Sequence, residues 1–149
     1  MRHRRPKDVG TAAETAVVRY ARANGFPGAD RLALSGVRDR GDVRLTTGLT
    51  AGVVVEVKGG KAAENASPAR ISEWLGEVAR AKDNAGAQVA FLVTKRRGVG
   101  PANAGGWYAH FDSGEFLTVA GADVPPEGVG PVTMSLASAL ALLRGTGWA

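Results

Sequence analysis

Residues 41–61 read GDVRLTTGLTAGVVVEVKGGK, and the run of valines inside this stretch predicts a buried β-strand. We interpret the stretch as a β-hairpin, with strands at residues 42–46 and 52–58 and a glycine-containing loop at residues 47–51. In this register, position 42 lies opposite position 56. The hairpin therefore determines which side chains meet on each face of the predicted sheet.

Polar side chains gather on one face of this hairpin. Because side chains alternate along a strand, the alternate valines share one face, and Glu56 and Lys58 share the other. Asp42 lies across the hairpin from Glu56, with about 5 Å between their Cβ atoms. Two carboxylates this close repel each other unless a cation lies between them, and Lys58 offsets only part of that repulsion. Oxygen ligands with room for water suit Mg²⁺, for which Mn²⁺ substitutes.

A fourth candidate, Glu14, lies on or beside the apolar side of a predicted helix and looks toward the sheet. The alternative is that Glu14 forms a capping box with Thr11 at the start of that helix. For Asp42 the alternative is a residue that merely begins a strand, and for Glu56 and Lys58 it is an ion pair on a solvated face. The alternatives for Asp42, Glu56 and Lys58 would require three independent coincidences on one small hairpin. We therefore favour a metal site.

The rest of the chain alternates between helical and strand periodicity, which predicts an α/β domain. Helices are expected at residues 11–24, from 67 to 86 and at about 135–144, and strands at 31–34, 88–94, 107–112 and 115–120. The last two strands, WYAHFD and EFLTVA, are expected to form a hairpin around Ser113 and Gly114. The segment QVAFLVT at residues 88–94 is typical of a central strand.

Composition sets further limits on the class of protein. A chain of 149 residues accommodates one domain, which we place at residues 11–149 behind a flexible basic arm at residues 1–10. The absence of cysteine excludes disulfides and thiolate metal sites and fits a reducing cytoplasm. No segment approaches the ~20 apolar residues of a membrane span, and no apolar region follows the basic start. Neither membrane insertion nor export by that route is therefore expected.

Basic residues outnumber acidic ones by 19 to 14 and give a net charge of +5, which makes polyanions the default partner. Most of the basic residues are arginines, whose planar guanidinium matches the geometry of a phosphate. They cluster in the N-terminal arm, around residues 38–40 and after the predicted strand at 88–94. The alternative is a soluble protein that is merely basic.

Glu14 on a leading helix, Asp42 after Gly41, and the triplet Glu56-Val57-Lys58 together resemble the motifs of the PD-(D/E)XK nuclease superfamily. The surrounding residues are more specific, because they resemble Holliday junction resolvase-like nucleases of actinobacterial phages, which are related in pattern to archaeal resolvases. The segments concerned are GFPGADRLALSGVRDRGDV, VVVEVKGGK, EWLGEVARAKDNAGAQ and VAFLVTKRRGVG, and the resemblance spans roughly residues 10–112. Two departures are the glycine at 41, where the superfamily has proline, and the lack of a matching motif from Gly114 onward.

The resemblance implies a restriction-endonuclease-like core, a mixed sheet with helices on both faces, and metal-dependent hydrolysis of DNA to 5′-phosphate and 3′-OH ends. Asp42, Glu56 and the Val57 carbonyl would bind Mg²⁺, and Glu14 would bind a second ion or a metal-bound water. Lys58 would orient or help deprotonate the attacking water and stabilise charge on the phosphate. The same resemblance implies a role in DNA recombination in the cytoplasm of a phage host.

A four-way DNA junction has approximate two-fold symmetry, so a resolvase is expected to be a C₂ homodimer with two active sites. Four aromatic residues are candidates for its interface or, alternatively, for the core: Trp107, Tyr108, Phe111 and Phe116. Residues expected to contact DNA are Arg2, Arg4, Arg5, Lys7, Ser35, Arg38, Arg40, Lys61, Lys95, Arg96 and Arg97. Two other functions stay open: a nuclease of the same chemistry that acts on nicks, flaps or duplex DNA, and an inactive DNA-binding module.

Overall fold

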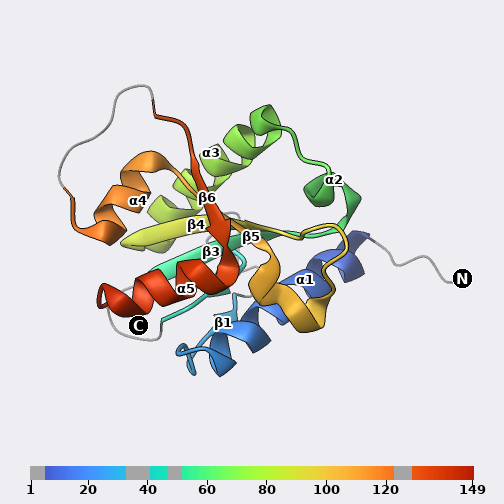
Figure 1. Cartoon of the computed structure of the whole chain (residues 1–149), viewed down its shortest axis with the longest axis horizontal. Coiled ribbons are helices and arrows are strands. Elements are labelled where there is room, and N and C mark those ends of the chain that lie inside the picture. Colours follow the sequence, from blue (N-terminus) through green and yellow to red (C-terminus); the bar gives the residue numbers. More distant parts are fainter. Residues whose placement is uncertain (1–5, 33–40, 47–51, 123–128) are drawn as a thin grey trace, which may run out of the picture.

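The structure is a computed structural model that describes residues 6–32, 41–46, 52–122 and 129–149. Within these residues the chain forms an α/β fold around a six-stranded mixed sheet, with the strands in the order of the sequence (Figure 1). The elements are α1 (Pro6–Ala23), β1 (Asp30–Arg31), β2 (Val43–Arg44), β3 (Val53–Lys58), α2 (Gly60–Glu64), α3 (Pro68–Ala85), β4 (Val89–Thr94), the 3₁₀ helix η1 (Pro101–Gly106), β5 (Tyr108–Phe111), α4 (Ser113–Ala120), β6 (Val132–Ser135) and α5 (Leu136–Gly145).

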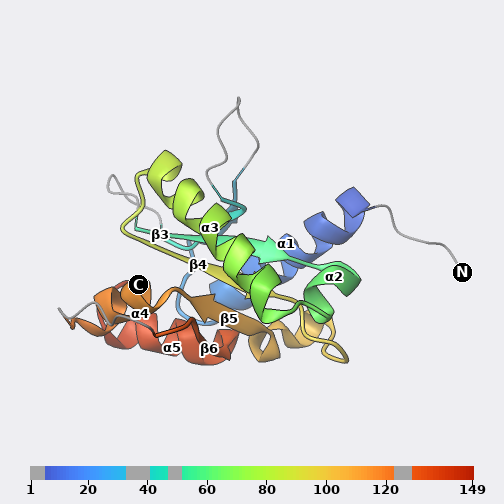
Figure 2. The ribbon, with the colours of Figure 1, turned by 90° about the horizontal axis from the view of Figure 1, so that it is seen from above.

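Among the described strands, β3 and β4 form the one parallel pair. Parallel neighbours cannot be joined by a tight turn, and here α2 and α3 supply the crossover between them. The carboxyl ends of β3 and β4 consequently lie at the same edge of the sheet. Figure 2 shows α2 following β3 at this edge, close to the first turns of α1.

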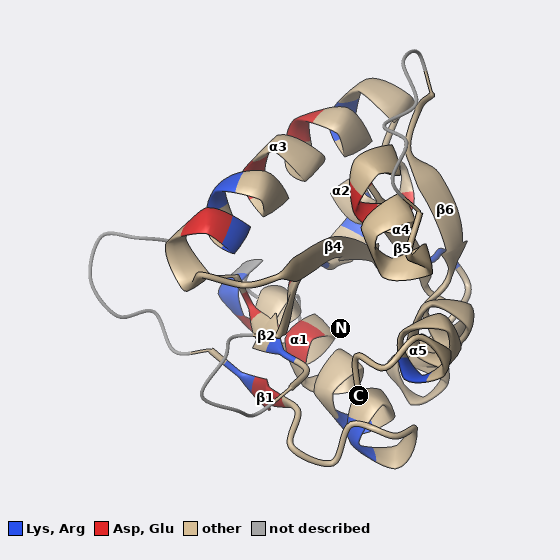
Figure 3. Ribbon diagram, turned by 90° about the vertical axis from the view of Figure 1, so that its left-hand side faces the viewer, with Lys and Arg blue, Asp and Glu red and all other residues tan. Residues whose placement is uncertain are grey.

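Helices cover the sheet on both faces (Figure 3). On one face, α1 and α5 enclose the larger core, in which the rings of Phe91 and Phe111 stack with their centroids 4.7 Å apart. On the other face, α3 packs Trp74 and Val78 against the middle strands. The prediction of an α/β domain with a mixed sheet and helices on both of its faces is confirmed.

Local capping signals explain why α3 and α5 begin and end where they do. The Ser67 side chain accepts a hydrogen bond of 3.1 Å from the Arg70 amide, and Gly86 ends α3 in the left-handed conformation with φ of 63°. The Ser135 hydroxyl accepts from the Ser138 amide at the start of α5. Both helices confirm the sequence prediction, and β4 confirms the predicted central strand.

The first helix begins at Pro6, earlier than the predicted start at residue 11. The prediction that residues 1–10 form a flexible arm is therefore wrong for residues 6–10, and residues 1–5 lie outside the described part of the chain. Proline suits the first position of a helix, and Asp8 in the first turn interacts favourably with the helix dipole. Because Thr11 lies inside the helix, the alternative of a capping box between Thr11 and Glu14 is also wrong.

The segment EFLTVA belongs to the helix α4, so the predicted hairpin of residues 107–120 is wrong. Asp112 caps this helix by accepting a 3.2 Å hydrogen bond from the Gly114 amide, and Glu115 lies in its first turn. The strand β5 instead pairs with β4 on one side and with β6 on the other, and the sequence did not predict β6. Trp107 and Phe111 are fully buried, so the suggestion that they form a dimer interface is wrong and the core alternative is correct for both.

Smaller differences concern the elements around β3. The short helix α2 was not expected. The strand β1 comprises Asp30 and Arg31, whereas residues 33–34 of the strand predicted at 31–34 lie outside the described part of the chain. The loop at residues 47–51 lies outside the described residues. No helix within the described ranges is both long enough and apolar enough to cross a membrane.

Candidate active site

The predicted hairpin forms with the predicted register, because Val43 lies opposite Val55 and Arg44 opposite Val54. Asp42 precedes the regular part of β2, and its backbone N–H donates to the Val55 carbonyl at 3.0 Å. The Asp42 carboxylate accepts a 2.8 Å hydrogen bond from the Val57 amide. The Asp42 side chain thus lies against the backbone of β3 at Val57, the residue that follows Glu56 in the chain.

Both faces of β3 are buried, which the alternating pattern alone did not reveal. Val53, Val55 and Val57 pack into the core on the α1 side. Glu56 lies on the α3 side with only 5% of its surface exposed. The alternative of a Glu56–Lys58 ion pair on a solvated face is therefore wrong, since Glu56 is not solvated and Lys58 pairs elsewhere. A buried carboxylate is costly unless other groups compensate its charge.

The backbone of β3 places a further oxygen beside the Asp42 carboxylate. In a strand the N–H and C=O groups of one residue point to the same side. The Val57 N–H points to Asp42, so the Val57 carbonyl points to that edge of β3 as well. The Lys58 carbonyl points the other way, because it accepts a 2.9 Å hydrogen bond from the Lys95 amide beyond β4.

Lys58 is held by residues of α3 that the sequence analysis did not identify. Its Nζ atom lies 3.0 Å from an Oε2 atom of Glu77 and 5.5 Å from the centre of the Trp74 ring. Glu77 follows Trp74 by three residues, so both side chains point to the same side of α3. This spacing was visible in the sequence, where Glu77 lies three residues after Trp74 and directly before the apolar Val78.

A groove opens at the carboxyl end of β3, next to Lys58. It has a volume of about 460 Å³ and is lined by Val9, Gly10, Val57, Lys58, Gly59, Gly60, Lys61, Ala62 and Trp74. Gly60 adopts a positive φ of 81°, which favours glycine at the point where the chain turns from β3 into α2. The groove therefore connects the polar face of β3 with the exposed Lys61 of α2.

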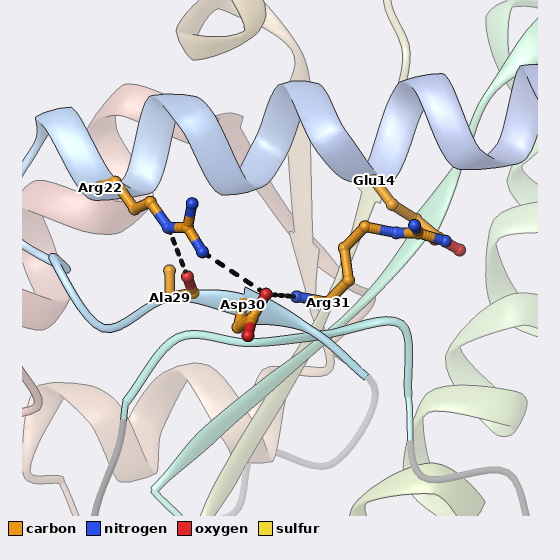
Figure 4. A network of polar contacts seen from close by, with 5 residues as sticks. All are labelled: Glu14, Arg22, Ala29, Asp30 and Arg31. Carbon is orange, nitrogen blue, oxygen red and sulfur yellow. Dashed lines mark hydrogen bonds and ion pairs between the residues drawn. The ribbon is translucent and has the colours of Figure 1, made fainter. Parts of the chain in front are cut away.

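Glu14 is bound to Arg31, and this pair belongs to a network at the edge of the sheet (Figure 4). An oxygen of Glu14 lies 2.8 Å from Nη2 and 2.9 Å from Nε of Arg31. Asp30 accepts from the Arg31 amide and pairs with Arg22, which also donates to the Ala29 carbonyl. The helix that carries Glu14 covers the valine face of β3. Within the described residues, no three acidic or histidine side chains are close enough to hold a metal ion by themselves.

The structure describes five of the residues that were predicted to contact DNA. Lys7, Lys61, Arg96 and Arg97 are exposed. Lys95 is half-buried and lies 2.5 Å from a carboxylate oxygen of Glu64, and the Arg96 guanidinium lies 5.2 Å from the centre of the Tyr108 ring. The other predicted contacts, Arg2, Arg4, Arg5, Ser35, Arg38 and Arg40, lie outside the described residues.

A second buried polar group lies on the α3 side of the sheet and was missed in the sequence analysis. The His110 ring contacts the hydroxyl of Thr94 at 2.9 Å and that of Thr133 at 2.8 Å. Burial lowers the pKa of His110 from 6.5 to about 4, so its imidazole is neutral near pH 7. A neutral imidazole bonded by two hydroxyls stabilises the pairing of β4, β5 and β6.

The functional interpretation rests on the residues described above, and not on similarity to known proteins. No protein-family model, curated protein or solved structure matches the chain.

Proposed function

We propose that this protein is a metal-dependent DNA endonuclease with a restriction-endonuclease-like core of the PD-(D/E)XK type. The observation that carries the proposal is the 2.8 Å hydrogen bond from the Val57 amide to the Asp42 carboxylate. It anchors the Asp42 carboxylate on the backbone of Val57, the residue between the buried Glu56 and Lys58, which share one face of β3. These are the residue types and the order of the PD-(D/E)XK motif that the sequence resembles.

The donor atoms suit Mg²⁺ or Mn²⁺. The candidate donors are all hard oxygens: the carboxylates of Asp42 and Glu56 and the carbonyl of Val57. Glu56 and Val57 belong to β3, and Asp42 is hydrogen-bonded to the β3 backbone. A hard ion held by few carboxylates keeps positions for water and substrate phosphate. When bound, such an ion polarises the phosphate and offsets the charge that develops on it. We propose that Glu14 serves a second ion or its water, with Arg31 fixing the Glu14 carboxylate.

The reaction is the hydrolysis of one phosphodiester bond. A water oxygen loses a proton to the solvent and forms a bond to phosphorus, and the bond from phosphorus to O3′ breaks. The leaving oxygen takes up a proton from a solvent water, which gives a 3′-OH and a 5′-phosphate. Lys58 orients the water or helps to deprotonate it, and its ammonium stabilises the negative charge on the phosphate. Glu77 and Trp74 hold the Lys58 side chain in place for this role.

Basic residues extend from the site along the edge of the sheet. Lys61 follows β3, and Arg96 and Arg97 follow β4, at the end where these parallel strands finish together. Cations at this edge attract DNA phosphates without reading the base sequence, so binding should weaken steeply with salt. We propose four-way junctions as the substrate and a C₂ homodimer as the active form, in which each subunit cuts one strand.

Cleavage of an immobile four-way junction in Mg²⁺, compared at equal concentrations with linear duplex, nicked duplex, fork and single strand, tests this function. Preferred cleavage of the junction supports a resolvase, and preferred cleavage of another DNA identifies a different nuclease of the same chemistry. Binding without cleavage of any DNA would indicate an inactive module.

The site itself is tested with Glu56→Gln, which keeps the shape of the side chain and removes its charge. We expect cleavage to fall by more than about 100-fold, because a metal ligand is lost. The matched control is Glu73→Gln on α3, where Glu73 pairs with Arg70 in solvent. Full cleavage by a folded Glu56→Gln protein would overturn the metal-site assignment.

A further inference from the structure

Within the described part of the chain, Tyr108 is the aromatic residue with an exposed side chain. It is 38% exposed, whereas its neighbour Trp107 and the nearby Phe111 are fully buried. Alternation along β5 explains the difference, since Trp107 and Ala109 enter the core on the α1 side and Tyr108 points to the opposite face. Among the described residues, Tyr108 and Val129 are the large hydrophobic side chains that remain exposed.

The register of the sheet places Tyr108 on the same face as the candidate catalytic lysine. Lys58 lies opposite Thr94 in the parallel pair, and Thr94 lies opposite Tyr108 in the antiparallel pair. Neighbouring strands are about 4.8 Å apart, so the backbones of Lys58 and Tyr108 are about 10 Å apart across β4. That separation lies within the length of a few nucleotides, since stacked duplex DNA rises about 3.4 Å per nucleotide along its axis and an unstacked strand is longer per nucleotide.

A cation accompanies the Tyr108 ring. The Arg96 guanidinium lies 5.2 Å from the ring centre, within the range of a cation–π contact. The loop that carries Arg96 is anchored at both sides, because the Lys95 amide bonds to the Lys58 carbonyl and the Trp107 indole donates to the Val99 carbonyl at 2.8 Å. Tyr108 and Arg96 therefore form a platform two strands from Lys58, with an aromatic ring and a planar cation carried by an anchored loop.

We propose that Tyr108 and Arg96 stack an unpaired nucleotide base beside the phosphate that is cleaved. Every base has a π-face that stacks on an aromatic ring or a guanidinium plane, independently of sequence. In a continuous duplex those faces are covered by neighbouring base pairs, whereas branch points, nicks and single strands expose them. The platform therefore selects DNA with unpaired or unstacked bases over linear duplex, and this inference rests on the proposed endonuclease function.

Binding of the full chain to dye-labelled DNA, measured by fluorescence anisotropy in EDTA, tests the platform without cleavage. The DNAs are a four-way junction, a fork, a single strand and a linear duplex. We expect Tyr108→Ala to weaken binding to the first three by about tenfold, as for the loss of one stacked base, and to change duplex binding less than about twofold. Tyr108→Phe keeps the ring and should retain the wild-type preference.

Arg97→Ala is the matched control, because Arg97 is the exposed neighbour of Arg96 in the same loop. We expect this variant to lose affinity for all four DNAs equally. Circular dichroism melting first establishes that each variant is folded. The proposed stacking role would be overturned if Tyr108→Ala weakened binding to every DNA equally, or weakened binding to none of them. A wild-type protein that binds and cleaves DNA while Tyr108→Ala behaves like wild type contradicts this inference alone. A wild-type protein that binds none of the DNAs contradicts the proposed function as well.

Discussion

The two faces of β3 are buried to a similar depth but carry opposite chemistry. On the α1 side, three valines pack into the core that α1 and α5 enclose. On the α3 side, Val54 is followed by Glu56, which is equally buried, and by Lys58, which pairs with Glu77. Burying a carboxylate lowers stability unless its charge is compensated, whereas burying a valine raises it. The valine face of β3 therefore contributes only apolar packing, whereas the opposite face combines apolar packing with a buried carboxylate and an ion-paired lysine.

Removal of a large side chain from the apolar face should have the largest effect on stability. Phe91→Ala deletes a fully buried ring that stacks on Phe111. We expect the free energy of unfolding to fall by about 4 kcal/mol, with a drop in Tm on the order of 10 °C. Thermal and urea unfolding measure both quantities, with exposed Val129→Ala as the control. Similar melting of the two variants would show that this face is not the main source of stability.

The buried histidine on the opposite side of the sheet predicts a dependence on pH. The unfolded chain binds a proton at His110 near pH 6.5, whereas the folded protein binds it only near pH 4. The contribution of His110 to stability should therefore be constant above pH 6.5 and fall by up to about 3 kcal/mol as the pH drops from 6.5 to 4.

His110→Gln isolates this contribution, because other titrating groups are present in both proteins. Burial raises the pKa of Glu115, for example, and that carboxyl is unchanged in the variant. Urea unfolding at a series of pH values should show a shallower loss of stability below pH 6.5 for His110→Gln than for wild type. Parallel curves for the two proteins would contradict the lowered pKa of His110.

The contact between Glu77 and Lys58 should matter for catalysis more than for stability. Glu77→Gln removes the charge that positions the Lys58 ammonium. If the proposed function is correct, kcat should fall roughly tenfold while KM for DNA changes little, because Glu77 acts through Lys58 and not on the DNA. Steady-state cleavage measures both, and Glu73→Gln on the same helix is the control. A change in KM alone would place Glu77 in DNA binding instead.

The smallest effect is expected at the ion pair on the sheet edge. Arg31→Met leaves Glu14 without the guanidinium that binds it, and should cost about 0.5 kcal/mol of stability because Arg31 is largely exposed. Glu14→Gln should cost a similar amount but reduce cleavage further, since it also removes the proposed ligand. Equal losses of cleavage in the two variants would show that Glu14 acts only through its pairing with Arg31.

Elements with strong local signals could be predicted from the sequence. Ser67 with the following proline, and Gly86 at the other end, fixed the bounds of α3, and the valine pattern gave the register of β2 and β3. The helix α4 was missed although Asp112 and Glu115 have the spacing of a capping box, because Ser113-Gly114 suggested a turn. The strand β6 carries little local signal, because its pairing with β5 depends on tertiary structure.

The candidate site was predictable only in part for a similar reason. Alternation identified Asp42, Glu56 and Lys58 as neighbours, but it does not show whether a helix covers their face. The burial of Glu56 and the pairing of Lys58 with Glu77 depend on where α3 packs, which no pattern within the hairpin specifies. The pairing of Glu14 with Arg31 likewise depends on the edge strand β1, whose extent the sequence did not define.

The hydrogen bond between Val57 and Asp42 turns one backbone amide into a reporter on the site. Beyond the regular part of β2, a side-chain carboxylate takes the place that a neighbouring strand's carbonyl would occupy for the Val57 N–H. The exchange of this single amide proton with solvent therefore depends on where the Asp42 carboxylate lies, and not only on the pairing of the strands. Hydrogen exchange at Val57, followed by NMR while Mg²⁺ is added, would register any movement of that carboxylate in the folded protein, before any DNA is present.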